Sequence, residues 1–393
     1  MNLLSLSKHS NDWWKSAVFY QIYPRSFYDS NNDGIGDLKG IIEKLDHLND
    51  GNGGGLGIDA IWISPFFPSP QADFGYDVSD YCDVDPIFGS IKDFDLLVSE
   101  SHKRCIRVVI DLVLNHSSDL HPWFAESRQN RTNDKADWYV WVDPDPDGNP
   151  PNNWLAVFGG AAWTYDPQRE QYYLHNFLPE QPDLNWYNPE VREALAGVIR
   201  FWMNRGVDGF RLDTANYYAF DRKLRDNPKR PEGSEILEEG QEANPLSSYV
   251  TKYSKDRPEN LEFIKFLRKI FDEKEYITSI GEIGSGEGLN STLKLSADYV
   301  KRKEGLHLAY TFALLSEKMN ADYFEHVIEI TEEAIEDGWP CWSLGNHDCK
   351  RIMSRYKCFA EREGFQQMML LLMLSVRGTP IIYYGEEVDM QEY

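Results

Sequence analysis

Eight short runs of apolar, β-prone residues recur along the 393-residue chain, and turn-forming residues bound each of them. The runs cover residues 18–23, 60–63, 107–114, 209–212, 276–280, 306–312, 340–344 and 380–384. Helical spacing of apolar residues fills most of the intervals, over residues 93–105, 189–205, 260–272, 323–337 and 361–374. Continuously apolar strands that alternate with helices are typical of parallel strands buried on both faces. Eight such units, with no Gly-x-Gly-x-x-Gly after the first strand, predict an α/β fold with a (β/α)8 TIM barrel rather than an open dinucleotide-binding sheet.

Two connections are far longer than the 2 to 6 residues of an ordinary loop between a strand and a helix. Residues 118–186, after the third strand, are rich in Trp, Tyr, Pro, Asn and Asp and contain short alternating pieces such as 171–177, which predicts a small inserted β-rich domain. Residues 217–260, after the fourth strand, are highly charged and are expected to form a lid or wall over the barrel mouth. Residues 13–117 and 187–393 are then expected to form the barrel itself.

Composition narrows the range of partners. Forty Lys and Arg against 64 Asp and Glu leave a net charge of −24, which repels nucleic acid and anionic lipid, so neither is an expected partner. No apolar run approaches the length of a membrane span, and the first 16 residues lack the pattern of a secretion signal. The five cysteines are an odd number without a Cys-x-x-Cys spacing, which is typical of reduced thiols. These features predict a cytoplasmic protein that acts on a small molecule.

Polar residues end several of the predicted strands. They are Asn115 and His116, Arg211 and Asp213, Glu282, and His347 and Asp348. Active sites of (β/α)8 barrels lie at the carboxyl ends of the strands, so these side chains are expected to meet. A single acidic residue after a strand is commonly a helix cap, but three clustered carboxylates carry large desolvation and repulsion costs and indicate a catalytic site. Zinc is disfavoured because the two histidines follow distant strands and no cysteine ligands accompany them.

Four segments at these strand ends resemble the signature regions of the α-amylase family of glycoside hydrolases. They are DLVLNHSS (111–118), GFRLDTAN (209–216), GEI (281–283) and SLGNHD (343–348). QPDLN (181–185) resembles the additional motif of the oligo-1,6-glucosidase and α-glucosidase branch. The resemblance runs from about Trp13 to the last residue and implies a barrel with a domain inserted after strand three, no organic cofactor and an α-glucoside substrate.

The resemblance also implies a division of labour among the carboxylates. Asp213 is expected to be the nucleophile, Glu282 the acid and base, and Asp348 the third carboxylate. Arg211 is expected to keep Asp213 ionised, while Glu282 holds a proton near neutral pH. Retention of the α configuration would follow, with the carboxyl groups of Asp213 and Glu282 about 5 to 5.5 Å apart.

Further residues are implied to hold the sugar. Those expected to contact the substrate are Asp73, Tyr76, His116, Phe158, Phe177, Arg211, Thr214 and His347. For Phe158 and Phe177, simple aromatic packing within the insertion is an alternative. In the resembling branch, Val directly after the nucleophile accompanies α-1,6 cleavage and Thr or Ala accompanies α-1,4 cleavage. Thr214 therefore favours maltose-like substrates, although such a difference amounts to only about 1 to 3 kcal/mol.

An acidic loop follows the first strand. Asp29, Asn31, Asp33, Ile35 and Asp37 occupy alternating positions, as the oxygen ligands of a cation loop do, with Gly34 at the sharp turn. Position twelve is Gly40 rather than a bidentate Glu, so this is no EF-hand, and an Asx-rich turn is the alternative interpretation. The resemblance supports a structural Ca²⁺ or Mg²⁺ here, remote from the carboxylates.

Three functions remain open from the sequence. The first is a retaining α-glucosidase that releases glucose from maltose-like oligosaccharides, with transglucosylation as a side reaction. The second is an oligo-1,6-glucosidase, or a relative similar to sucrose isomerase or trehalose synthase. The third is a non-catalytic interaction protein on the same fold, or an inactive fragment. Family members continue past strand eight with a helix and a C-terminal β-sandwich, whereas this sequence ends at Tyr393, so both are expected to be missing and an apolar patch to be exposed.

Overall fold

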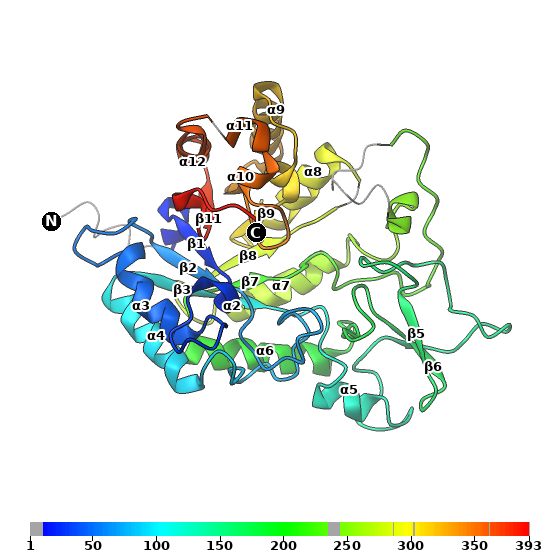
Figure 1. Cartoon of the computed structure of the whole chain (residues 1–393). Helices are drawn as coiled ribbons and strands as arrows, with labels where there is room; N and C mark the ends of the chain where they lie inside the picture. Colours follow the sequence, from blue (N-terminus) through cyan, green and yellow to red (C-terminus); the bar gives the residue numbers. More distant parts are fainter. Residues whose placement is uncertain (1–10, 235–243, 286, 302, 361, 393) are drawn as a thin grey trace.

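The computed structural model describes residues 11–234, 244–285, 287–301, 303–360 and 362–392. Its main sheet comprises β1 (Phe19–Ile22), β2 (Ala60–Ile63), β3 (Arg107–Leu112), β7 (Gly209–Leu212), β8 (Thr278–Glu282), β9 (Leu308–Tyr310), β10 (Cys341–Ser343) and β11 (Thr379–Tyr383). The strands are parallel, in the order β10-β11-β1-β2-β3-β7-β8-β9. The end strands β9 and β10 also contact each other, so the sheet is a nearly closed barrel (Figure 1). The predicted barrel fold is confirmed.

Helices surround this sheet (Figure 1). The longer ones are α3 (Leu38–Leu48), α4 (Ile91–Lys103), α6 (Pro189–Asn204), α7 (Asn260–Phe271), α8 (Leu289–Val300), α9 (Ala321–Ile335) and α12 (Phe365–Ser375). The short ones are η1 (Trp13–Ser16), α2 (Pro24–Phe27), η4 (Phe312–Leu315), α10 (Ile352–Arg355), α11 (Lys357–Ala360) and η5 (Glu386–Val388). Helix α4 starts at a capping box in which Ser90 and Asp93 bond each other's backbone N–H groups.

Helix α12 departs from its predicted range because it begins at Phe365, after Gly364 with a φ of +79°, rather than at residue 361. Its outward face exposes Met368, Leu371 and Leu374. This helix therefore presents three exposed apolar side chains to solvent. No helix in the described ranges is long and apolar enough to cross a membrane.

The insertion after β3 contains a separate three-stranded antiparallel sheet. Its strands are β4 (Trp141–Val142), β5 (Trp163–Asp166) and β6 (Gln171–Leu174), in the order β4-β6-β5, and α5 (Pro122–Ser127) precedes them. A small apolar cluster that includes Trp154 and Trp163 lies within it. The segment is thus β-structured as expected, while its boundaries at 118 and 186 stay a prediction.

The excursion after β7 packs against this insertion. It contains the short helix η3 (Pro245–Ser248), and residues 235–243 of the predicted 217–260 segment lie outside the described residues. Trp154 Nε1 donates to the Arg225 carbonyl (2.9 Å), and Asn244 Nδ2 donates to the Val157 carbonyl (2.7 Å). The described parts of the two long connections therefore contact each other, while a lid or wall over the barrel mouth stays a prediction.

Alternation along the strands explains where the polar residues lie. Phe19, Val109 and Ile280 belong to an apolar cluster that is distinct from the larger core formed with the helices. Two positions further along the same strands stand Gln21, Asp111 and Glu282, and residues two positions apart on a strand share one face. The barrel interior thus changes from apolar to polar toward the carboxyl ends of its strands.

Candidate active site

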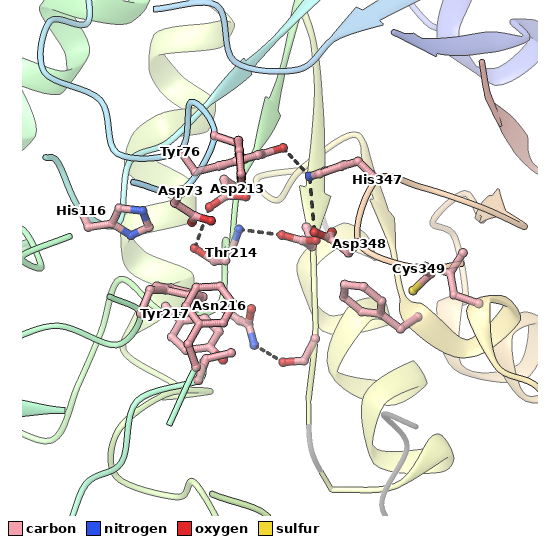
Figure 2. Close-up of a pocket in the computed structure, with 18 of the residues that line it drawn as sticks. Asp73, Tyr76, His116, Asp213, Thr214, Asn216, Tyr217, His347, Asp348 and Cys349 are labelled. Carbon is pink, nitrogen blue, oxygen red and sulfur yellow. Dashed lines mark hydrogen bonds and ion pairs between the residues drawn. The ribbon is translucent and has the colours of Figure 1, made fainter. Parts of the chain in front are cut away.

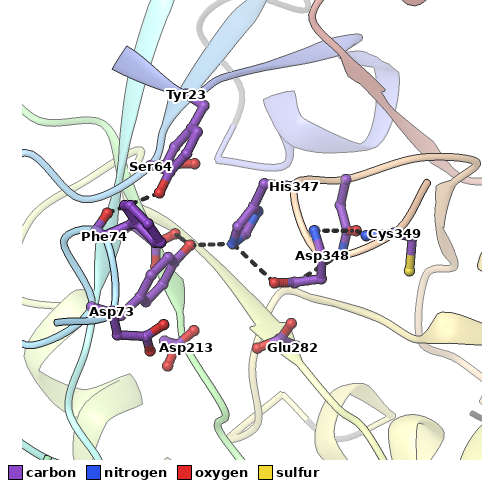
Figure 3. A network of polar contacts seen from close by, with 12 residues as sticks. Tyr23, Ser64, Asp73, Phe74, Asp213, Glu282, His347, Asp348 and Cys349 are labelled. Atoms are coloured by element: carbon purple, nitrogen blue, oxygen red, sulfur yellow. Dashed lines mark hydrogen bonds and ion pairs between the residues drawn. The ribbon is translucent and has the colours of Figure 1, made fainter. Parts of the chain in front are cut away.

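A single buried guanidinium holds three carboxylates together at this end of the barrel. Arg211 Nη1 lies 2.9 Å from Asp111 Oδ1 and 2.6 Å from Asp213 Oδ1, and Nη2 lies 2.8 Å from Glu282 Oε1. Arg211 and Asp111 are fully buried and stand in register on β7 and β3. Figure 3 shows the carboxyl groups of Asp213 and Glu282 facing one space. The parallel register of neighbouring strands therefore assembles the predicted catalytic pair.

The pKa of Asp213 differs from the sequence-based expectation. Burial raises the pKa of Asp213 well above its usual range, and Arg211 opposes this increase while the charges of Glu282 and Asp111 add to it. Burial likewise raises the pKa of Asp111. Arg211 thus favours the ionised form of Asp213, but its single positive charge does not outweigh the desolvation of Asp213 and Asp111.

Asp348 belongs to a second cluster on the β10 side of the cavity (Figures 2 and 3). His347 Nε2 lies 3.5 Å from Asp348 Oδ1 and 2.7 Å from the Tyr76 hydroxyl, and the Tyr76 and His347 rings stack with centroids 5.2 Å apart. The Tyr76 hydroxyl also donates to Asp111 Oδ2 (3.1 Å). Burial lowers the pKa of His347 to about 4, so its ring is neutral at pH 7. The two clusters are thus linked through Tyr76.

Asp73 and His116 share one partner. The fully buried Gln181 places its Nε2 2.8 Å from Asp73 Oδ2 and 3.1 Å from His116 Nε2. Burial raises the pKa of Asp73 to about 6, and it lowers the pKa of His116 to about 3. Gln181 was not among the predicted site residues, although the QPDLN motif was noted. Asp111 was missed too, although an acid inside an apolar strand was a signal for it.

Thr214 contacts both members of the predicted catalytic pair. Its φ of 42° is a left-handed value that β-branched residues rarely adopt, at a cost of about 1 to 3 kcal/mol. In this conformation the Thr214 N–H donates to Glu282 Oε2 (3.1 Å), and its hydroxyl donates to Asp213 Oδ2 (3.3 Å). The strained turn therefore orients both carboxylates.

These side chains surround a cavity of about 730 Å³. Every predicted catalytic or sugar-binding residue lines it except Arg211, which lies buried beneath the carboxylates. Phe177 is buried against His116, with ring centroids 5.1 Å apart, and Phe158 is 57% exposed. Both phenylalanines thus line the cavity, and their ring centroids are 6.0 Å apart. Such a cavity, polar at its base and aromatic at its mouth, suits a single sugar ring at depth.

The acidic loop after β1 lies apart from this cavity. The Asp29 carboxylate accepts backbone N–H bonds from Asn31 (3.0 Å) and Gly34 (2.7 Å), and these bonds, led by that of Gly34, lower its pKa. Asp37 caps α3 by accepting from Gly40 N (2.7 Å). The oxygen donors fit a hard cation in type. However, no group of three or more His, Cys, Asp or Glu within the described ranges is close enough together to hold a metal ion.

Known proteins resemble the chain over nearly its whole length. Residues 21–393 match the family described as "Alpha amylase, catalytic domain". A probable alpha-glucosidase of Rhizobium meliloti (strain 1021) is 50% identical over 390 residues, which are 99% of this chain and 69% of the relative. An oligo-1,6-glucosidase of Heyndrickxia coagulans is 39% identical, over 96% of this chain and 67% of the relative. The chain thus spans about two thirds of the length of these relatives.

Solved structures support the same relationship. An alpha-glucosyl transfer enzyme, XgtA, superimposes with a TM-score of 0.91 at 49% identity, over 97% of this chain and 69% of that one. The trehalulose synthase MutB from Pseudomonas mesoacidophila MX-45 gives a TM-score of 0.83 at 39% identity, over 97% of this chain and 66% of that one. Since these matches include the strands and loops that carry the carboxylates, the chain belongs to the alpha-amylase family of glycoside hydrolases, close to its alpha-glucosidases and oligo-1,6-glucosidases.

Proposed function

We propose that this chain carries the active site of a retaining α-glucosidase that releases glucose from the non-reducing end of short α-1,4-linked oligosaccharides such as maltose. The observation that carries this proposal is the pair Asp213 and Glu282, held on one Arg211 guanidinium at the base of the cavity. A cavity of this size suits an enzyme that removes one terminal glucose. The presence of Asp348 beside the pair disfavours a non-catalytic role.

The crowded carboxylates explain how the proton is used. Positive charge that develops at the sugar C1 in the transition state favours the ionised form of Asp213. Asp213 then attacks C1 while Glu282 protonates the departing oxygen. Glu282 next removes a proton from water, which displaces Asp213 with a second inversion. Retention requires the two carboxyl groups to be about 5 to 5.5 Å apart in the complex.

Residues around the pair would orient the terminal glucose. Asp73 and the neutral rings of His116 and His347 present acceptors and donors for sugar hydroxyls, and the Tyr76 ring offers an apolar face. Such contacts accelerate the reaction only if they tighten as the ring flattens toward the oxocarbenium ion. These roles follow the family resemblance, position by position.

The proposal also includes a preference for one type of glycosidic linkage. Thr214 favours α-1,4 over α-1,6 cleavage, and its hydroxyl contacts Asp213. A second candidate is isomerisation of sucrose, which is favoured by the structural similarity to a trehalulose synthase. Glucose transfer to other acceptors is the expected side reaction, in line with the similarity to an alpha-glucosyl transfer enzyme. Product identity separates the three possibilities.

A structural cation and a cytoplasmic location complete the proposal. Asp29, Asn31, Asp33, Asp37 and the Ile35 carbonyl supply only oxygen donors, which suits Ca²⁺ or Mg²⁺. A rise in melting temperature on adding either ion after chelation, without a change in bond cleavage, would support this site. No disulfide joins the five cysteines, all of which lie in the described ranges, and this fits a reducing compartment.

The test is to incubate the purified chain with maltose, isomaltose and sucrose and to identify every product. We expect glucose from maltose only, formed first as the α-anomer by NMR. Asp213→Asn is expected to lower this activity at least about 10³-fold because it removes the nucleophile. Glucose from isomaltose would instead favour an oligo-1,6-glucosidase, and a rearranged disaccharide from sucrose would favour an isomerase. Inactivity on all three sugars would overturn the proposal for this chain.

A further inference from the structure

A buried lysine lies close to the segment that follows β8, and an inference about it rests on the proposed function. Lys255 belongs to the excursion after β7, and only 5% of its surface is exposed. Lysines are rarely buried to this extent, because removing an ammonium group from water is costly. The contacts of this ammonium group therefore show what the fold gains from burying it.

The ammonium group joins two parts of the cavity lining. Lys255 Nζ donates to the Tyr217 hydroxyl (3.0 Å) and to the Gly284 carbonyl (3.0 Å), and it lies 4.7 Å from the centroid of the Tyr217 ring. Tyr217 and Gly284 both line the cavity. Hydrogen bonds from a charged donor are about twice as strong as neutral ones. Lys255 thus connects the excursion to the backbone beyond β8.

The Gly284 carbonyl stands two positions after the proposed acid and base, Glu282. Pairing of β8 with β7 ends at Gly281, and pairing with β9 ends at Glu282. Beyond this point the Gly284 carbonyl accepts a second bond, from Asn216 Nδ2 (2.8 Å, Figure 2), and the same nitrogen also donates to the Asp256 carboxylate. Side chains of the excursion therefore hold the backbone where the sheet no longer does.

The position of the Glu282 carboxyl group depends on this backbone. Its Oε1 contacts Arg211 Nη2 (2.8 Å) and its Oε2 accepts from the Thr214 N–H (3.1 Å). The Glu282 carbonyl accepts from the Ala215 N–H (3.1 Å), so β7 and its end hold Glu282 from one side. The bonds to Gly284 hold it from the other. A shift of about 1 Å in a catalytic group lowers the rate by up to about 10²-fold.

We infer that Lys255 is a positioning residue for the acid and base. By holding the Gly284 carbonyl, it keeps the Glu282 carboxyl group where its proton reaches the glycosidic oxygen. Lys255 does not line the cavity and transfers no proton itself. The nucleophile is held separately, since the Asp213 N–H donates to the Leu112 carbonyl (3.2 Å) of β3. Loss of Lys255 should therefore impair proton transfer to the leaving group more than attack on C1.

Two substrates that differ in their need for an acid test this inference. The leaving group of maltose needs a proton, whereas the fluoride of α-glucosyl fluoride leaves without one. For both substrates kcat/KM reports the steps up to formation of the glucosyl ester on Asp213. Lys255→Met removes the donors and keeps most of the length of the side chain. We expect it to lower kcat/KM about tenfold for maltose and less than about twofold for α-glucosyl fluoride.

A matched control separates this role from the general loss of a lysine. Lys274 Nζ also donates to a backbone carbonyl, that of Met203 (2.6 Å), but it lies before the amino end of β8. We expect Lys274→Met to keep the wild-type ratio of the two kcat/KM values. This ratio is independent of the amount of folded enzyme, so partial unfolding does not change it.

A milder variant keeps the test decisive if Lys255→Met does not fold. Lys255→Gln retains a polar group on a side chain that is one bond shorter, so it holds Gly284 less well. We expect it to shift the ratio in the same direction, by about threefold, with α-glucosyl fluoride again nearly unaffected.

The outcomes separate the two levels of the proposal. A wild-type chain that is inactive on both substrates would overturn the proposed function and this inference together. With an active wild type, equal losses on both substrates in the Lys255 variants would show a merely structural role and would overturn the inference alone. Unchanged kcat/KM on both substrates would overturn it as well. A loss confined to maltose would support it.

Discussion

The two ends of the barrel hold cavities with opposite charge arrangements. The cavity of about 520 Å³ at the amino ends of the strands is lined by residues such as Lys15 and Arg268. Lys15 pairs with Asp12 and Arg268 with Asp272, each at 2.8 Å and each with an acid that is more than half exposed. At the carboxyl ends, one buried Arg211 is shared by Asp111 and the catalytic pair.

The two ends of the barrel therefore differ in how strongly their charged groups are desolvated. Exposed charges that pair one to one are well hydrated and contribute little to stability in either direction. Buried carboxylates that outnumber their cation keep raised pKa values, as Asp213 does, at a cost in desolvation. The fold tolerates that cost where a proton must be held and released. Four predictions test the contrast, from the largest expected effect to the smallest.

The largest effect is expected for Glu282→Gln. Loss of the acid should lower maltose hydrolysis by about 10² to 10⁴-fold, because the sugar leaving group needs a proton. Fluoride leaves without one, so α-glucosyl fluoride should still give a rapid burst of about one equivalent, followed by slow turnover, since the missing base delays release of the glucosyl ester. Rapid-quench measurement of fluoride checks this. Equal losses on both donors, without a burst, would contradict the assigned role.

Next in size is the stability effect of Arg211→Met. Removing the shared cation leaves three buried carboxylates without a counter-charge, which is expected to destabilise the fold by about 3 to 5 kcal/mol. Urea denaturation at pH 7 measures this change, and lowering the pH should recover part of it because the carboxyl groups then become neutral. A cost below about 1 kcal/mol would mean that the cluster is not truly buried.

A smaller effect is expected from the titration of Asp73. Its raised pKa of about 6 means that the carboxylate, which we propose accepts hydrogen bonds from sugar hydroxyls, is present above pH 6 and lost as the pH falls through this value. KM for maltose should therefore rise about tenfold between pH 7 and pH 5. Asp73→Asn should bind maltose weakly at both pH values and lose this dependence. A wild-type KM that is flat over the same range would contradict the proposed contact.

The smallest effect is expected at the opposite end of the barrel. Lys15→Met removes an exposed ion pair with Asp12, so its cost should be within about 1 kcal/mol and should decrease further at high salt. Maltose hydrolysis should be unchanged. Thermal denaturation at two salt concentrations and steady-state kinetics check both points. A large loss of activity would show that the lower cavity is coupled to the carboxylates.

Elements of the fold could be predicted where a short stretch of sequence carried a clear apolar pattern. Strands β2 and β7 occupy the predicted residues because an apolar run between turn residues is a purely local pattern. Helix α8 was missed because Thr292 and Ser296 lie among its buried positions and obscure the apolar period. The active-site carboxylates were found through strand ends and family motifs, and the structure brings them together.

Along the chain alone, the alternation of strands and helices determined the barrel, and the polar strand ends determined which residues meet at its mouth. Only the tertiary structure decided how these residues share their charges. Asp111 contacts Arg211 because β3 and β7 are in register, and Gln181 reaches Asp73 across 108 positions of sequence. Desolvation, which sets the pKa of Asp213, depends on everything packed around the group. Such long-range burial is a property of the assembled fold and has no signature in local sequence.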